Sequence, residues 1–184
     1  MPPIPAHLLS DAQKRAAAEF QANRKQEVFG PFAVLIRSPE VMLRAMAMGD
    51  YMRYRTVLPA RLNELIILMT ARRWTQQYEW YAHYGAALKA GLDPEIVKAV
   101  AEGRRPERMG ADEGLVHDFC SELFHNQSVS DTTYGRAAAR FGEQGVVEMV
   151  GVAGYYTFLS FVMNTARTAT PQTTAVPPLV PWPT

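Results

Sequence analysis

The stretch RLNELIILMTARRWTQQYEWYAHYGAALKAGL, residues 61–92, decides how the chain is expected to fold. Its first part repeats apolar residues three and four positions apart, which is the spacing of an α-helix with one buried face. Its second part ends at Gly91, and glycine commonly ends helices because it adopts the left-handed conformation without strain. The stretch therefore predicts two helices, over about residues 59–74 and 76–90, that fold back on each other as a hairpin.

The same helical periodicity extends through most of the chain, and no window shows the strict alternation of a strand. Ser10 is expected to cap a first helix that Gly30-Pro31 breaks. Asp131 is expected to cap a short helix that ends before Gly142, and a long apolar helix follows over residues 143–167. We expect an all-α bundle of about seven helices.

The 184 residues, 48% of them hydrophobic, can bury one core. We expect a single helical domain over residues 1–167. The remaining segment, TATPQTTAVPPLVPWPT (168–184), is rich in proline and threonine and cannot propagate a helix. It is expected to be disordered or to form an extended arm, which we interpret as wrapping a neighbouring subunit.

The chain has 19 lysines and arginines and 18 aspartates and glutamates. This near balance excludes a strong electrostatic field of one sign over the whole protein. We therefore expect neither a nucleic-acid partner nor a membrane surface. The most apolar run, residues 149–163, is shorter than the roughly 18–20 residues that cross a bilayer, so it predicts a buried helix. The first residues lack the pattern of a secretory signal, and a cytoplasmic protein is expected.

Glu79 and His83 lie four residues apart on one face of the second arm of the hairpin. If the hairpin closes, the carboxylate of Glu64 on the first arm points at the same spot. A carboxylate beside an imidazole suits proton transfer near neutral pH. The same spacing is equally typical of an exposed ion pair on a helix surface, and the pattern alone leaves both interpretations open.

The strings R-L-N-E-L-I-I-L, Y-E-W-Y-A-H and A-A-L-K-A-G-L together resemble the carboxymuconolactone decarboxylase superfamily. The resemblance covers roughly residues 41–164. It implies the helical bundle of the alkyl hydroperoxidase D-like type and a homo-oligomer, commonly a trimer or hexamer.

Relatives of the alkyl hydroperoxidase D type carry a CxxC pair between a glutamate and a histidine. Glu64 and His83 fit the glutamate and histidine positions, whereas Gln76 and Glu79 stand where the two cysteines would be. Neither residue forms a thiolate, so thiol peroxidase activity is not expected. The single cysteine, Cys120, lies outside the motif and is expected to be buried and inert.

What remains resembles the decarboxylase branch, which removes carbon dioxide from a carboxylated unsaturated lactone in aromatic compound catabolism without a metal or organic cofactor. The resemblance implies a cofactor-independent lyase. We predict that His83 donates the proton, that Glu79 orients and tunes it, and that Glu64 is a second acid/base or orienting group. These three roles are interchangeable at this stage.

Four further residues are predicted to bind substrate. Arg61 is expected to clamp a substrate carboxylate, with an ion pair to Glu64 or Glu79 as the alternative. The other three are Gln76, Trp80 and Tyr84, of which the aromatic pair would form a wall for a flat ring. Two other functions stay open: a metal-dependent enzyme that uses Glu64, Glu79 and His83 as ligands, and a non-catalytic ligand-binding oligomer of the same fold.

Overall fold

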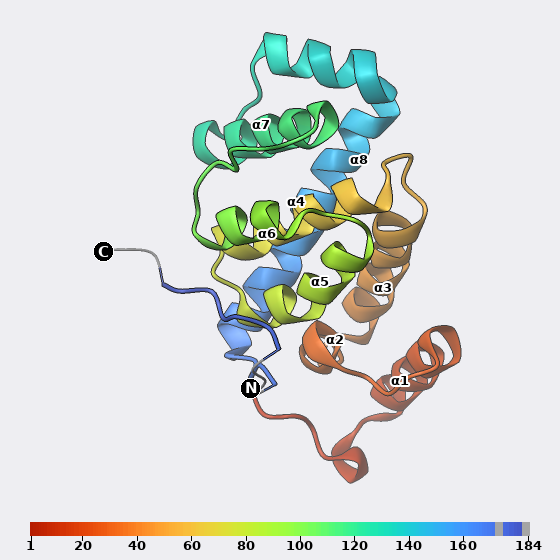
Figure 1. Ribbon diagram of the computed structural model, residues 1–184. Helices are drawn as coiled ribbons and strands as arrows, with labels where there is room; N and C mark the ends of the chain where they lie inside the picture. The colour runs from red at the N-terminus through yellow and green to blue at the C-terminus, as the bar shows by residue number, and fades with distance from the viewer. Residues whose placement is uncertain (172–174, 182–184) are drawn as a thin grey trace.

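The computed structural model describes residues 1–171 and 175–181, and in these residues it is helical with no strand (Figure 1). The all-α expectation is therefore confirmed. The elements are a 3-10 helix η1 (Ala6–Leu8) followed by α1 (Asp11–Arg24), α2 (Gly30–Leu35), α3 (Pro39–Tyr54), α4 (Ala60–Arg73), α5 (Gln77–Lys89), α6 (Pro94–Ala101), α7 (Ala111–Asn126) and α8 (Asp131–Ala166).

Local capping explains why several helices begin and end where the sequence predicts. The Ser10 hydroxyl accepts a hydrogen bond from the backbone N–H of Gln13, whose side chain accepts one from the backbone N–H of Ser10. The Asp93 side chain accepts the backbone N–H of Glu95 and so caps α6. Gly91, with φ of 90°, follows the end of α5 in the left-handed region.

Three details differ from the sequence prediction. Gly30-Pro31 does not only break the chain, because Pro31 occupies the first turn of the additional short helix α2. The cap of α8 is Ser130, whose hydroxyl accepts the backbone N–H of Thr133, and not Asp131. The two helices predicted around Gly142 are the two halves of α8, joined at a kink where Gly142 has φ of 72°.

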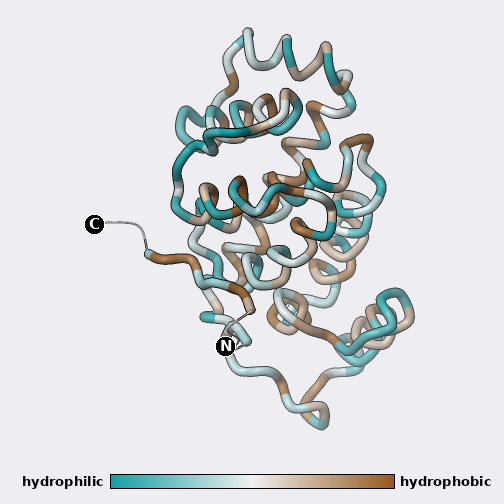
Figure 2. The backbone as a smooth tube through the Cα atoms, viewed as in Figure 1, coloured by the Kyte–Doolittle hydropathy of each residue, from teal (hydrophilic) through white to brown (hydrophobic). Residues whose placement is uncertain are grey.

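The two helices at the centre of the fold are α4 and α8. Helix α8 packs against α2, α3, α4 and α7, while α4 also packs against α5 and α6. Along the tube in Figure 2, hydrophobic residues concentrate where these helices meet, and hydrophilic residues follow the outer turns of α1 and α7. By length and composition α8 could also cross a membrane, but 56% of its most apolar window is buried inside the fold, as in the core helix of a soluble protein.

The described part of the C-terminal segment is extended and lies along α4 and α5 of its own chain. The Gln77 amide donates to the carbonyl of Leu179 (2.6 Å) and accepts the N–H of Leu179 (3.0 Å). The Trp80 indole donates to the carbonyl of Pro177 (2.8 Å), and Arg72 donates to the carbonyl of Val180 (2.5 Å). The arm predicted to wrap a neighbour is therefore anchored on its own chain, apart from residues 172–174 and 182–184, which lie outside the described residues.

Candidate active site

The closed hairpin of α4 and α5 brings Glu64 against His83. The Nδ1 atom of His83 lies 2.7 Å from Oε2 of Glu64. Both residues are buried, with 3% of His83 and 7% of Glu64 exposed. Because α4 is covered by α5, α6, α7 and α8, a carboxylate in its middle is removed from water and needs a hydrogen-bond partner. His83 is that partner.

Glu79 completes the cluster from one turn earlier on α5. Its Oε2 lies 3.5 Å from Nε2 of His83, and Glu79 is 3% exposed. At that distance the contact is longer than a short hydrogen bond, and it is an ion pair only when the imidazole is protonated and Glu79 is ionised. An exposed helical pair, the alternative that the spacing left open, is therefore wrong, because both side chains are buried.

Hydrogen-bond chemistry fixes the atom through which His83 can transfer a proton. The carboxylate of Glu64 can only accept, so Nδ1 of His83 carries the hydrogen that it donates. Nε2 is then the nitrogen that gains or loses a proton, and it faces Glu79. Glu64 thus has the orienting role, and Glu79 stands at the reactive side of the ring.

Burial raises the pKa of Glu79, and the nearby charge of Glu64 adds to that effect. His83 and Arg53 act in the opposite direction without cancelling the effect of burial. Glu79 therefore holds its proton to a higher pH than an ordinary glutamate does. A carboxylic acid with a raised pKa beside an imidazole is a suitable proton donor.

A small cavity of about 50 Å³ adjoins Glu79 and His83. Its wall comes from α1, the α1–α2 connection, α2, α3, α5 and α8. The aromatic and apolar lining residues are Phe29, Pro31, Phe32, Tyr78, Tyr155, Tyr156 and Leu159. A space of this size holds only a few water molecules.

Tyr156 forms the wall nearest to the imidazole. Its ring centre lies 5.0 Å from that of His83 at an interplanar angle of 86°. Burial raises the pKa of Tyr156 well above the ordinary tyrosine range. The phenol therefore stays protonated and can serve only as a neutral hydrogen-bonding group.

Two arginines, Arg24 and Arg53, line the same cavity, and the sequence did not point to either. Arg24 is committed to Asp50, whose Oδ1 lies 2.7 Å from its Nη2. Arg53 is half-buried, stands 5.3 Å from the ring of Tyr54, and forms no ion pair with any carboxylate in the described part of the chain. Arg53 lies on α3, outside the hairpin, and no sequence spacing links it to His83.

Arg61, the predicted carboxylate clamp, does not line this cavity. Its Nε lies 2.6 Å from Oε1 of Glu113, and its Nη2 lies 4.0 Å from Oδ2 of Asp112. The alternative expectation, a pair with Glu64 or Glu79, is therefore wrong, while the clamp stays a prediction for a residue outside this cavity. The reason is that the long side chain reaches the first turn of α7, where these two acidic residues lie.

The other three predicted substrate-binding residues also lie away from the cavity. Gln76 caps α5 by accepting the N–H of Tyr78 (2.6 Å), and its amide nitrogen donates to Asn164 (2.8 Å). The Trp80 indole donates a hydrogen bond to the C-terminal segment, and the ring centre of Tyr84 lies 5.9 Å from that of Trp80. Cap formation and packing therefore occupy these groups in this structure.

The remaining chemistry predicted from the sequence concerns metals and the thiol. Among residues 1–171 and 175–181, no group of three or more His, Cys, Asp or Glu side chains has a geometry that could hold a metal ion. The two nitrogens of His83 each face a different carboxylate, so the three groups pair with one another and do not converge on a common point. Cys120 is buried, and burial raises the pKa of its thiol to about 12, as expected for an inert cysteine.

Residues 39–110 match the model of the carboxymuconolactone decarboxylase family. The matched segment runs from α3 to the loop after α6, and it contains Glu64, Glu79 and His83 together with Arg53. No curated protein matches the chain.

Proposed function

Because residues 39–110 match the model of the carboxymuconolactone decarboxylase family, we propose that this protein is a cofactor-independent lyase that transfers protons on a small unsaturated lactone or carboxylate. The observation that carries the proposal is the buried cluster in which Glu64 holds Nδ1 of His83 while Nε2 faces Glu79. Such an arrangement supplies an oriented base and a neighbouring acid in a site shielded from water.

For a decarboxylation, the electron pair of the broken carbon–carbon bond moves into the unsaturated lactone as a dienolate, and carbon dioxide leaves. Glu79 or protonated His83 then delivers a proton to carbon, and water restores that proton afterwards. Glu64 keeps the ring of His83 oriented throughout. The substrate supplies its own electron sink, so the step consumes one proton and needs no oxidant or reductant.

The substrate needs a cation for its carboxylate, and Arg53 is the residue we assign to it. Arg53 lines the cavity with Glu79 and His83 and has no carboxylate partner of its own among the described residues. Ligand pockets usually measure about 300–1,000 Å³, so a lactone does not enter a cavity of about 50 Å³ unless side chains move. We expect the half-buried Arg53 side chain to turn toward the incoming anion and enlarge the site.

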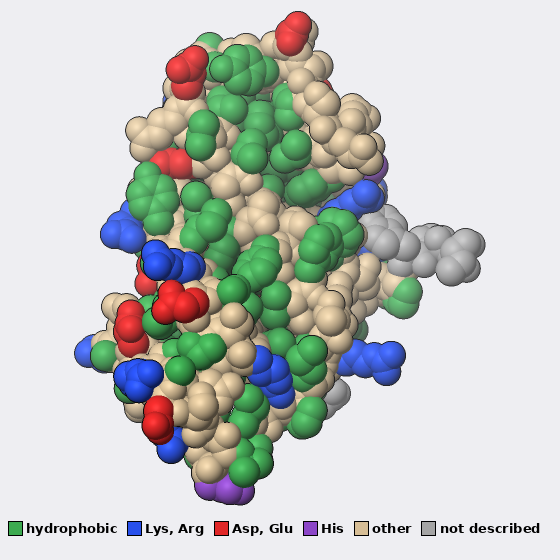
Figure 3. All heavy atoms as spheres, turned by 180° about the vertical axis from the view of Figure 1, so that it is seen from behind, with side chains coloured by type: hydrophobic (Ala, Val, Ile, Leu, Met, Phe, Trp, Pro, Cys, Tyr) green, Lys and Arg blue, Asp and Glu red, His purple; other side chains and the backbone are tan. Residues whose placement is uncertain are grey.

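We also propose that the chain forms a homo-oligomer, a trimer or hexamer as in its family. The support is an exposed apolar surface on α3 and α8, made of Val41, Met48, Val147, Val150, Phe158 and Phe161. Figure 3, a view from behind, has hydrophobic side chains running through the middle of the molecule. Light scattering on wild type and on Phe158→Glu tests this: a larger assembly that the substitution dissociates supports the proposal, and a monomeric wild type contradicts it. A cytoplasmic location stays a prediction.

The decisive experiment is to incubate purified protein with a panel of carboxylated unsaturated lactones and follow carbon dioxide release. His83→Ala should abolish the release, and His7→Ala, in an exposed histidine of η1, should not change it. Circular dichroism verifies that both variants are folded. Turnover that survives His83→Ala refutes the assigned site. Ligand binding without turnover on any lactone points to the second candidate, a non-catalytic binding oligomer.

A further inference from the structure

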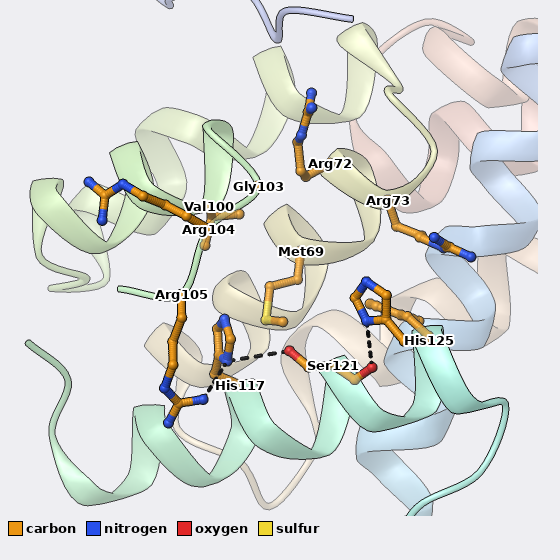
Figure 4. Close-up of a pocket in the computed structure, with 11 residues that line it drawn as sticks. Met69, Arg72, Arg73, Val100, Gly103, Arg104, Arg105, His117, Ser121 and His125 are labelled. Atoms are coloured by element: carbon orange, nitrogen blue, oxygen red, sulfur yellow. Dashed lines mark hydrogen bonds between the residues drawn. The ribbon is translucent and has the colours of Figure 1, made fainter. Parts of the chain in front are cut away.

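A second pocket, of about 210 Å³, lies between the end of α4, the loop after α6 and one face of α7 (Figure 4). None of its lining residues belongs to the cavity beside His83. Met69 and Val100, both buried, and the half-buried Phe124 give it an apolar lining. The polar lining groups are three side chains of α7 and four arginines from the end of α4 and the loop after α6.

The hydrogen bonds of His117 determine which of its nitrogens can contact a ligand. Nη1 of Arg105 lies 3.2 Å from Nδ1 of His117, and Oγ of Ser121 lies 3.3 Å from the same atom. A guanidinium can only donate, so Nδ1 accepts and the hydrogen of the neutral ring is on Nε2. Burial and the charge of Arg105 both lower the pKa of His117, which keeps the ring neutral. His117 therefore has one N–H donor, and it points away from Ser121 (Figure 4).

His125 lies two turns further along the same face of α7. Its Nδ1 lies 2.8 Å from the carbonyl of Ser121, which can only accept, so the hydrogen of that bond belongs to Nδ1. In the neutral ring the other nitrogen, Nε2, is then an acceptor, so His125 borders the pocket without donating a hydrogen bond to an anion. In Figure 4 the His125 ring stands on the pocket side of α7, with Met69 between it and the loop after α6.

The electrostatic surroundings favour an anion. Four arginines line the pocket: Arg72, Arg73, Arg104 and Arg105. Among the described residues, Arg105 pairs with Asp118 and Arg104 pairs with Glu102. In Figure 4 the guanidinium groups of Arg72 and Arg104 turn away from Met69, so the fixed contacts come from His117 and Arg105 while the others add to the positive field.

We propose that this pocket binds a small organic carboxylate with a flat apolar body. The carboxylate would accept hydrogen bonds from Nε2 of His117 and from Arg105. The body of the ligand would lie on Met69 and Phe124, the apolar part of the lining. Since the volume is below that of usual drug-sized pockets, the fitting ligands are about the size of a single-ring aromatic acid.

Calorimetric titration with benzoate as the probe tests the proposal, with benzamide as a neutral probe of the same shape. Wild type should bind benzoate but not benzamide. Arg105→Ala should weaken benzoate binding about tenfold, as expected for a hydrogen bond to a charged group. Arg108→Ala, which removes the same charge from an exposed arginine outside the pocket, should change it less than twofold.

Three results would overturn the proposal: no benzoate binding, equal binding of benzamide, or an equal loss in Arg105→Ala and Arg108→Ala, which would indicate attraction by net charge alone. The His83→Ala variant separates this pocket from the proposed lyase site. Benzoate binding that is unchanged in His83→Ala supports the second pocket. Binding that disappears in this variant places the benzoate in the first cavity and refutes the inference.

Discussion

Replacing Leu179 by alanine should destabilise the whole protein, although Leu179 lies in the extended segment after α8 and outside the helical bundle. The Leu179 side chain is 2% exposed, and the two hydrogen bonds between its backbone and Gln77 fix the segment on α5. The neighbouring carbonyl of Pro177 holds the indole of Trp80, the residue that follows Glu79. Loss of the anchor therefore acts on the helix that carries the candidate site.

The expected loss is about 2–3 kcal/mol. Leucine-to-alanine substitutions in closed cores cost about 2–5 kcal/mol, depending on how well the site collapses. The lower part of that range applies, because a terminal segment that has lost its anchor can detach and leave no permanent cavity. For a chain of this size the melting temperature should fall by about 4–10 °C.

Urea unfolding followed by circular dichroism measures this loss, and Val180→Ala is the matched control. Val180 is the next residue and is 61% exposed, so its truncation should cost less than about 0.5 kcal/mol. Similar losses in the two variants, or a loss below about 0.5 kcal/mol in Leu179→Ala, would refute the view that Leu179 anchors the segment.

Three further predictions concern the site and α8. Burial raises the pKa of Glu79 above the ordinary 4.5, so the folded state binds this proton more tightly than the unfolded state, and wild type loses stability as the pH rises from that value. The stability of Glu79→Gln relative to wild type should therefore increase from pH 4 to pH 8 in urea unfolding, while lyase activity falls. A stability difference independent of pH would contradict this. Arg53→Ala should raise KM for an anionic substrate about tenfold or more, as expected for a lost charged hydrogen bond, and an unchanged KM in steady-state assays would exclude Arg53 as the carboxylate partner. Gly142→Ala should destabilise the protein by about 1 kcal/mol or more because φ at Gly142 is 72°, whereas Gly135→Ala, in the regular part of α8, should stabilise it by up to about 1 kcal/mol. The added methyl group meets no atom within 4 Å at either position, so the comparison isolates the backbone conformation. Equal shifts of the melting temperature would show that backbone strain is absent at Gly142.

The sequence by itself predicted the helical hairpin and placed Glu79 and His83 on one helical face, whereas their burial against Glu64 was open until the structure showed it. The reason is that the hairpin and the shared face depend on short distances along the chain. Four residues make one helical turn, and a short connection between two apolar helices makes them antiparallel neighbours. Ser10, Gly91 and Asp93 mark helix ends for the same reason, since each involves only residues of the adjacent helical turn.

Only the tertiary structure decided which cation lies at the site and which side chains line it. Arg61 was the predicted clamp because it lies three residues from Glu64, yet its flexible side chain pairs with Glu113, 52 residues away, while Arg53 reaches the cavity from α3. Trp80 was expected to line the site, but a carbonyl 97 residues later takes its indole N–H. Such contacts depend on the crossing of helices that are distant in sequence and on the rotamers of long side chains, and no local spacing encodes either of them.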